Sequence, residues 1–328
     1  MNNFKKIGMT ALAASLVSTS VFAGELTATG SAGMTVEGYS GSTLQSDTGY
    51  SMADSVVLSG STELDNGMTV SMSFELDSDN PSGSSYDDKS VSVSSDTLGT
   101  LKLSGHGGSS ATSAVDATAA GNIYDNFDGA TSANGLTSAG VNLLAAAGGA
   151  NNLYYSLPAM VDGLAMNASL NTAGDTGNNA LGFNVIYTGV EGLSLTYAQA
   201  DIEGGSAAAN GDHTVMNASY AYGPVTVAYT NSDYDTGAAN TRALAQEVTS
   251  YAISYTVSDA ISLTYGTETI ESGLASEVTD AEYEGITASY TAGGMTISLT
   301  SQDAENIDFG TNADEDYEYW ALGLSFAF

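Results

Sequence analysis

The sequence has no cysteine, only three prolines and only five lysine and arginine residues in 328 positions. Without cysteine there are no disulfides, no thiolate chemistry and no cysteine-based metal sites. Nucleic acid is excluded as a partner, because its phosphates bind clustered basic side chains. Beyond residue 23 the chain also lacks the run of roughly 20 apolar residues that a membrane-spanning helix requires. If this chain lies in a membrane, it must cross it as a closed β-barrel.

The first 23 residues have the pattern of a secretory signal peptide. Lys5 and Lys6 provide a positive start, a short apolar stretch follows, and Ala23 is a small residue at the expected cleavage position. Removing two lysines moves the formal net charge from −33 to −35. We therefore expect a signal peptide over 1–23 and one mature domain over 24–328.

Alternation of apolar and polar residues with period 2 recurs along the chain and predicts strands with one apolar face. In 68–76, for example, even positions are apolar and odd positions are polar, and the preceding Asp65-Asn66-Gly67 suits a tight turn. The same reasoning gives sixteen strands: 25–39, 50–63, 68–77, 87–95, 100–105, 151–157, 164–171, 180–188, 193–200, 212–222, 225–233, 248–257, 260–269, 281–291, 295–303 and 316–328.

The connections between these strands differ in length at the two ends. Tight turns such as Gly223-Pro224 and Gly293-Gly294 alternate with longer polar loops. Tyrosines also fall in two rows along the apolar faces, at Tyr187, Tyr222, Tyr255 and Tyr290, and at Tyr197, Tyr229 and Tyr265. Short turns at one end, long loops at the other and two aromatic rows are typical of outer-membrane barrels. The prediction is an all-β fold, a closed antiparallel transmembrane β-barrel of about 16 strands.

The C-terminal strand carries the most specific resemblance. Trp320, Leu322, Leu324, Phe326 and the terminal Phe328 alternate with smaller or polar residues. Together with Leu98-Gly-Thr-Leu-Lys-Leu-Ser-Gly and Asn151-Asn-Leu-Tyr-Tyr-Ser-Leu-Pro, this pattern resembles the Gram-negative general porins, especially the sixteen-stranded alphaproteobacterial type. The resemblance implies an outer-membrane homotrimer that contacts lipid and lipopolysaccharide. It also implies that Phe328 is the signal read by the outer-membrane assembly machinery.

A long connection of about 45 residues, 106–150, separates the predicted fifth and sixth strands. A loop of this length in a compact domain is expected only where it is functional. In the family that the chain resembles, this third loop folds into the lumen and narrows the pore. The resemblance therefore implies that its acidic residues line the constriction: Asp116, Asp125 and Asp128.

Strand parity places the charged wall residues. Glu37, Glu63, Glu75, Glu268 and the single basic residue Lys102 share the polar face and should line the pore, whereas Lys89 points outward and Arg242 lies in a loop. The family usually opposes the loop acids with a basic cluster, which this sequence lacks. We therefore expect passive diffusion of ions and small hydrophilic solutes with a preference for cations.

Two other function classes remain as alternatives. An outer-membrane barrel enzyme with a rim site could use His106 or the adjacent Asp212 and His213, but neighbouring residues on a strand point to opposite faces. A surface structural or adhesive β protein could explain the acidic loops, which are expected to associate only weakly with Ca²⁺ or Mg²⁺. No cofactor, no specific metal site and no catalytic residue is expected.

Overall fold

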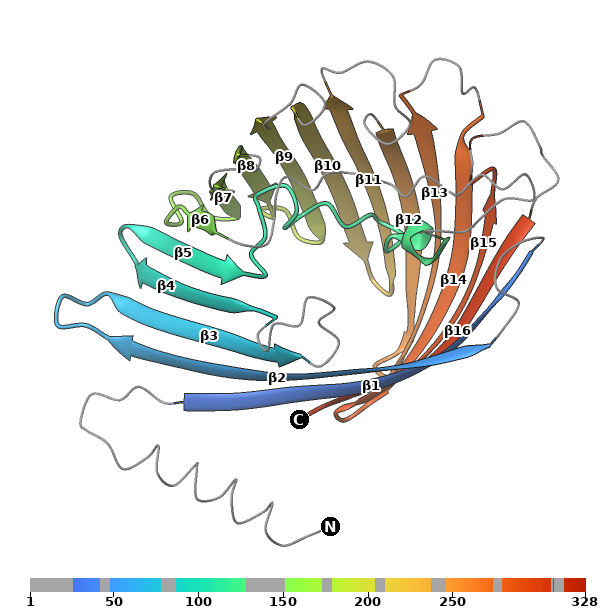
Figure 1. The fold of residues 1–328 in the computed structure, drawn as a ribbon, viewed down its shortest axis with the longest axis horizontal. Coiled ribbons are helices and arrows are strands. Elements are labelled where there is room, and N and C mark those ends of the chain that lie inside the picture. The colour runs from blue at the N-terminus through green and yellow to red at the C-terminus, as the bar shows by residue number, and fades with distance from the viewer. Residues whose placement is uncertain are drawn as a thin grey trace, which may run out of the picture.

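The computed structural model describes residues 26–41, 48–77, 87–127, 151–172, 179–203, 210–236, 246–273, 279–307, 309 and 316–328. In these ranges the chain forms sixteen antiparallel strands. Each strand pairs with its sequence neighbours, and the first pairs with the last, so that the sheet closes into a barrel (Figure 1). The predicted fold class is confirmed. The signal peptide predicted over 1–23 lies outside the described residues.

The strands have the following bounds: β1 Leu26–Ser40, β2 Gly49–Glu63, β3 Thr69–Asp77, β4 Lys89–Ser95, β5 Gly99–His106, β6 Asn152–Ser156, β7 Leu164–Thr172, β8 Asn179–Tyr187, β9 Leu193–Glu203, β10 Gly211–Tyr222, β11 Val225–Thr236, β12 Gln246–Ser258, β13 Ile261–Ser272, β14 Ala281–Ala292, β15 Met295–Glu305 and β16 Asp316–Ala327. The described residues contain one short 3₁₀ helix, η1 Ile123–Phe127, in the connection between β5 and β6. No helix in the described part of the chain is long and apolar enough to cross a membrane.

The seam of the barrel is the pairing of β1 with β16. Their register runs from Ser31 opposite Ala327 to Ser40 opposite Glu318. At its end, the backbone N–H of Gly30 donates to the carbonyl of Phe328 at 2.7 Å, and the N–H of Phe328 donates back at 2.9 Å. The ring of Phe328 covers Gly30, where a Cβ atom would lie 2.6 Å from the ring. The pairing of β1 with β16 closes the barrel, and Phe328 extends this seam by one residue pair.

Tight turns lie at one end of the barrel, as the sequence predicts. Gly67, Gly223 and Gly293 have φ of 79°, 58° and 62°. Glycine adopts these left-handed conformations without steric cost, which lets the chain reverse within a few residues. The connections after β1, β3, β5, β7, β9, β11, β13 and β15 leave the opposite end.

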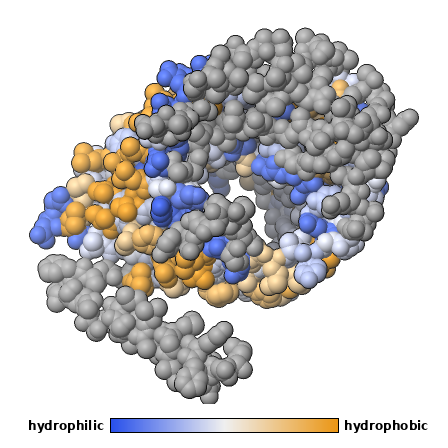
Figure 2. All heavy atoms as spheres, in the orientation of Figure 1, coloured by the Kyte–Doolittle hydropathy of each residue, from blue (hydrophilic) through white to orange (hydrophobic). Residues whose placement is uncertain are grey.

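The outer face changes character along several strands of the β9 to β16 side. On β13 the outward Ile261, Leu263 and Tyr265 are exposed near the turn end, and the outward Glu271 lies near the loop end. The predicted tyrosine rows also belong to the outer face, for example Tyr197 on β9 and Tyr290 on β14. Exposed apolar side chains surround the barrel, and Figure 2 shows the apolar residues on the outside of β2 to β5.

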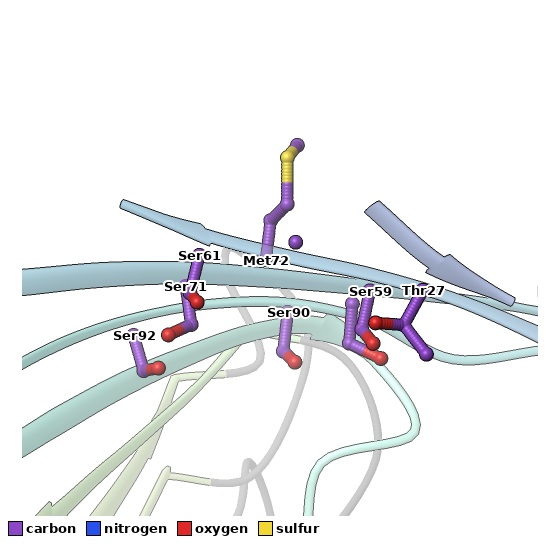
Figure 3. A pocket seen from close by; sticks show the side chains of 9 residues that line it. Thr27, Ser59, Ser61, Ser71, Met72, Ser90 and Ser92 are labelled. Carbon is purple, nitrogen blue, oxygen red and sulfur yellow. The ribbon is translucent and has the colours of Figure 1, made fainter. Parts of the chain in front are cut away.

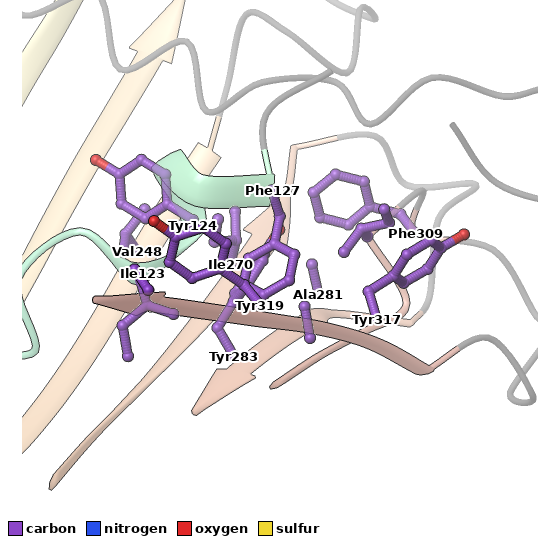
Figure 4. Packing of buried hydrophobic residues seen from close by; sticks show 13 residues of the cluster. Ile123, Tyr124, Phe127, Val248, Ile270, Ala281, Tyr283, Phe309, Tyr317 and Tyr319 are labelled. Carbon is purple, nitrogen blue, oxygen red and sulfur yellow. The ribbon is translucent and has the colours of Figure 1, made fainter. Parts of the chain in front are cut away.

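On the β12 to β16 side of the barrel, the inner face of the loop end is apolar and buried. Ile270 of β13, Tyr283 of β14 and Tyr319 of β16 pack with Phe127 of η1 (Figure 4). The ring centroids of Phe127 and Tyr283 are 5.8 Å apart, and those of Phe127 and Tyr319 are 6.4 Å apart. On this side, apolar residues thus line the outside near the turns and the inside near the loops.

This inversion explains where the predicted strand ends were wrong. β11 continues to residue 236 instead of 233, and β13 to 272 instead of 269. Outward acids such as Asp235 and Glu271 suggest a loop, because they interrupt the apolar face. The strands continue nevertheless, because their inward residues, such as Ile270, are packed in the core.

Candidate functional site

The long connection after β5 runs along the inner face of the barrel wall in its described part, 107–127. The N–H of Ala111 donates to the Ser169 hydroxyl of β7 at 2.8 Å, and the amide of Asn184 on β8 donates to the Ala111 carbonyl at 2.7 Å. Figure 1 shows this segment leaving β5 and crossing the interior. The fold predicted for the whole loop also involves 128–150, which lie outside the described residues, and stays a prediction.

Further along, the same segment contacts three other strands. Asn217 of β10 donates to the Val115 carbonyl at 2.5 Å, and the N–H of Ala120 donates to the hydroxyl of Ser250 on β12 at 3.0 Å. The Asn126 amide donates to the side-chain carbonyl of Gln302 on β15 at 2.8 Å. These bonds occur over one side of the barrel, β7 to β15. The wall on that side supports the loop.

Glu268 is the central anchor of this segment. Its side chain is only 1% exposed, and its two carboxylate oxygens accept hydrogen bonds from the Thr118 hydroxyl and from the N–H of Tyr124, the latter at 3.1 Å. Gly266, two residues earlier on β13, leaves room for the close approach of Ala120. Glu268 therefore faces inward, as predicted, but its carboxylate is occupied by the loop.

The predicted wall acids lie in three different places. Glu37 on β1 accepts a hydrogen bond of 2.9 Å from the hydroxyl of Tyr319. Glu63 lies exposed at the turn end of β2. Glu75 on β3 accepts from the Ser55 hydroxyl of β2.

Glu75 also belongs to a cluster of three carboxylates with Asp87 and Asp88, whose ligand oxygens lie within 4.8 Å of one another. Burial, followed by the negative charges of Glu75 and Asp87, raises the pKa of Asp88, and Lys102 and His106 oppose that rise. Lys102 on β5 thus acts on the inner wall near this cluster, consistent with its predicted direction. Lys89 packs over Gly105 on the outer face, and Arg242 lies outside the described residues.

Two of the three predicted loop acids are described. Burial raises the pKa of Asp116 to about 6, with a smaller contribution from the charge of Asp125. Burial also raises the pKa of Asp125, although a hydrogen bond from Asn122 partly offsets this. Asp128 lies outside the described residues. The constriction assigned to these residues and to the wall acids stays a prediction.

Sequence reasoning missed the polar wall residues that hold the loop, above all Asn184 and Asn217. Asparagine is uncommon in strands. Its presence on the inner face of β8 and β10 could therefore have indicated residues that hold the loop. It also missed the apolar anchor formed by Ile123, Tyr124 and Phe127, which are all buried. Their spacing in a short 3₁₀ helix gave no periodic pattern.

The two histidines that the enzyme alternative would use lie on different strands. His213 is fully buried on the inner face of β10, and one ring nitrogen lies 2.9 Å from the Ser232 hydroxyl. The neighbouring Asp212 is exposed on the opposite face. His106 contacts the backbone carbonyl of Asp87 near the acidic cluster. His106 lies close enough to Asp88 for its charge to oppose the rise of that pKa, and the described hydrogen bonds of His213 include no acid.

A closed antiparallel barrel with an apolar outer band and a polar interior defines a transmembrane β-barrel, because only closed barrels and helices satisfy the backbone in lipid. A sequence model of the Gram-negative porin family matches residues 8–328. The chain belongs to this family. It is a multi-pass protein of the outer membrane, and the family and fold support a channel rather than an enzyme.

Solved porin structures share the fold. The anion-selective porin from Comamonas acidovorans is 15% identical with a TM-score of 0.67, covering 93% of this chain and 99% of that chain. OmpT of Vibrio cholerae in its trimer form is 14% identical with a TM-score of 0.66, covering 93% and 100%. A mutant of the Rh. blastica porin is 16% identical with a TM-score of 0.62, also covering 93% and 100%. A comparison with curated proteins finds no significant match.

Proposed function

We propose that this outer-membrane channel passes ions and small hydrophilic solutes by passive diffusion and prefers cations. The observation that supports this most is the distribution of charge on the inner surface. Asp116 and Asp125 lie on the loop segment, and the cluster of Glu75, Asp87 and Asp88 lies by β3 and β4. Among the described residues, Lys102 is the only Lys or Arg on the inner face.

Uncompensated carboxylates attract cations most strongly where the channel is narrow, since low-dielectric walls focus the field. Screening limits this effect to roughly 8 Å at physiological ionic strength. The preference should therefore weaken as the salt concentration rises. Reversal potentials across a KCl gradient, recorded at low and high salt, test both statements. A chloride preference at low salt would refute the proposed selectivity.

We further propose that the chain forms a homotrimer, as OmpT of Vibrio cholerae does in its trimer form. Detergent extracts analysed by native mass spectrometry would give three copies per particle if this is correct. A monomer as the only species after mild extraction would count against it.

The remaining proposals concern assembly and surroundings. Residues 1–23 act as a cleaved signal peptide, and Phe328 is recognised by the outer-membrane assembly machinery. Lipid and lipopolysaccharide surround the barrel, and Ca²⁺ or Mg²⁺ associates weakly with acidic groups such as those of Asp87 and Asp88. N-terminal sequencing of the mature protein tests the cleavage: a first residue other than Gly24 would shift or remove the predicted site.

A further inference from the structure

A hollow of about 300 Å³ lies on the wall formed by β1 to β4. Seven hydroxyl-bearing residues line it, together with Gly60 and Met72: Thr27, Ser59, Ser61, Ser71, Ser73, Ser90 and Ser92. Figure 3 shows Met72 pointing away from the side to which the labelled hydroxyls point. Met72 is exposed on the outer face, so the hydroxyls belong to the inner face and the hollow opens toward the lumen.

Strand register arranges these hydroxyls in two rows. The first row runs from Thr27 through Ser59 and Ser73 to Ser90, on four successive strands. The second row, Ser61, Ser71 and Ser92, lies one pair nearer to the tight turns. Neighbouring strands are about 4.8 Å apart. A solute in the hollow therefore meets hydroxyls on several strands at once.

These hydroxyls lack protein partners among the described residues. None of the seven has a hydrogen bond to another residue within the described part of the chain. On the β7 to β15 side, several hydroxyls already have hydrogen-bond partners within the protein. Ser250 holds the loop, the hydroxyls of Ser254 and Thr264 share a bond of 2.9 Å, and those of Thr287 and Thr300 share one of 3.3 Å.

The lining of the hollow contains no charged side chain. Each Ser or Thr hydroxyl can both donate and accept a hydrogen bond, which matches solutes whose own hydroxyls do the same. A fixed row of charges would favour an ion, and a purely apolar hollow would offer a hydrophilic solute no hydrogen bonds. The chemistry therefore suits uncharged molecules with several hydroxyl groups.

We infer that this hydroxyl-lined hollow is a subsite for uncharged polyhydroxylated solutes, such as short sugars, on their way through the channel. The inference rests on the proposed diffusion function. It separates two properties of one pore: the carboxylates govern ion preference, and the hydroxyl wall governs the residence of neutral solutes.

The test uses Ser59→Ala/Ser73→Ala, which removes one cross-strand hydroxyl pair from the hollow. The matched control is Ser194→Ala/Ser219→Ala, a cross-strand pair on the inner face of β9 and β10. The current through single channels is recorded at fixed KCl while maltose is added. A polyethylene glycol of similar hydrodynamic size measures the effect of volume alone.

Maltose should reduce the native current more than the polyether does. In the Ser59→Ala/Ser73→Ala variant, the maltose concentration that gives half of the maximal current reduction should rise about tenfold. The reason is that two hydrogen bonds of modest net strength are lost. The control variant should keep the native value, and both variants should keep the native reversal potential. The second-row variant Ser61→Ala/Ser71→Ala should repeat the result.

An unchanged response to maltose in both hollow variants would overturn the subsite while the channel itself stands. An equal weakening of the maltose effect in the hollow variants and the control variant would also overturn the subsite. Maltose binding would then not be confined to the hollow. Absence of any ion current through the native protein in a sugar-free bilayer would instead refute the diffusion function and the subsite with it.

Discussion

The two halves of the barrel wall use similar polar residues in different ways. On the β7 to β15 side, side chains such as Ser169, Asn184 and Glu268 are bonded to the loop segment that follows β5. On the β1 to β4 side, the hydroxyls of the hollow have no protein partner within the described residues. One wall positions the loop, and the other remains available to solutes. A polar residue on the inner face is therefore not by itself a pore-lining residue.

The largest effect is expected at the seam where these two walls join. Replacing Phe328 with Asp should abolish most of the barrel in the outer membrane, because the residue closes β16 onto Gly30 and is the proposed assembly signal. Quantifying folded protein in outer-membrane fractions measures this loss, and Phe328→Tyr is the conservative control. Native levels of the Asp variant would contradict both roles.

The next largest effect concerns the anchored wall. Glu268→Ala leaves the Thr118 hydroxyl and the Tyr124 N–H without their acceptor. We expect a loss of about 3 kcal/mol in unfolding free energy and strong fluctuations of the open-channel current. Urea unfolding in lipid vesicles and bilayer recording measure the two quantities.

Glu268→Gln separates anchoring from charge, because it keeps an acceptor oxygen. Glu268→Gln should lower the unfolding free energy less than Glu268→Ala does. It should also leave the reversal potential nearly native. A large fall in cation preference with a steady current would mean that Glu268 acts through its charge.

A smaller effect should distinguish the inner face from the outer face. Lys102→Glu should increase cation preference, since it removes the basic group near Asp88 and adds a carboxylate. Lys89→Glu makes the same charge change on the outer face and should leave the reversal potential unchanged. Equal shifts in the two variants would contradict the assigned directions of these side chains.

The smallest effect is a dependence on pH. The pKa of Asp116 is raised to about 6, so its carboxylate is charged at pH 7 and mostly protonated at pH 5. Cation preference should therefore decrease as the pH falls between these values. In the Asp116→Asn variant, cation preference should decrease less over the same pH range. A pH profile identical to the native one would show that Asp116 does not act on permeating ions.

Much of the barrel could be predicted from the sequence because its signals are local. Period-2 alternation located every strand, and the turn glycines fixed which end carries the short connections. The C-terminal pattern ending in Phe328 indicated the family. The direction of Lys102 and Lys89 also followed from parity alone, since adjacent apolar residues such as Leu101 and Leu103 are exposed on the outer face.

The contacts inside the lumen could not be predicted in this way. Parity turned Glu268 inward, but only the folded loop determines that Thr118 and Tyr124 occupy its carboxylate. Glu75 and Asp88 are neighbours across the β3–β4 hairpin, which the predicted strands 68–77 and 87–95 allow, but parity alone does not indicate that their carboxylates cluster with that of Asp87. Contacts between distant segments depend on the path of the loop.

The central claim is that acids on the loop and on the facing wall make the channel prefer cations. The most direct measurement is the reversal potential across a KCl gradient at low salt, for the native protein and for the variant with Asp116, Asp125 and Asp128 replaced by Asn. We predict a sign that indicates K⁺ preference in the native channel and a clearly smaller potential in the variant. A chloride preference in the native channel would contradict the claim, and an equal potential in the variant would remove the loop acids from it.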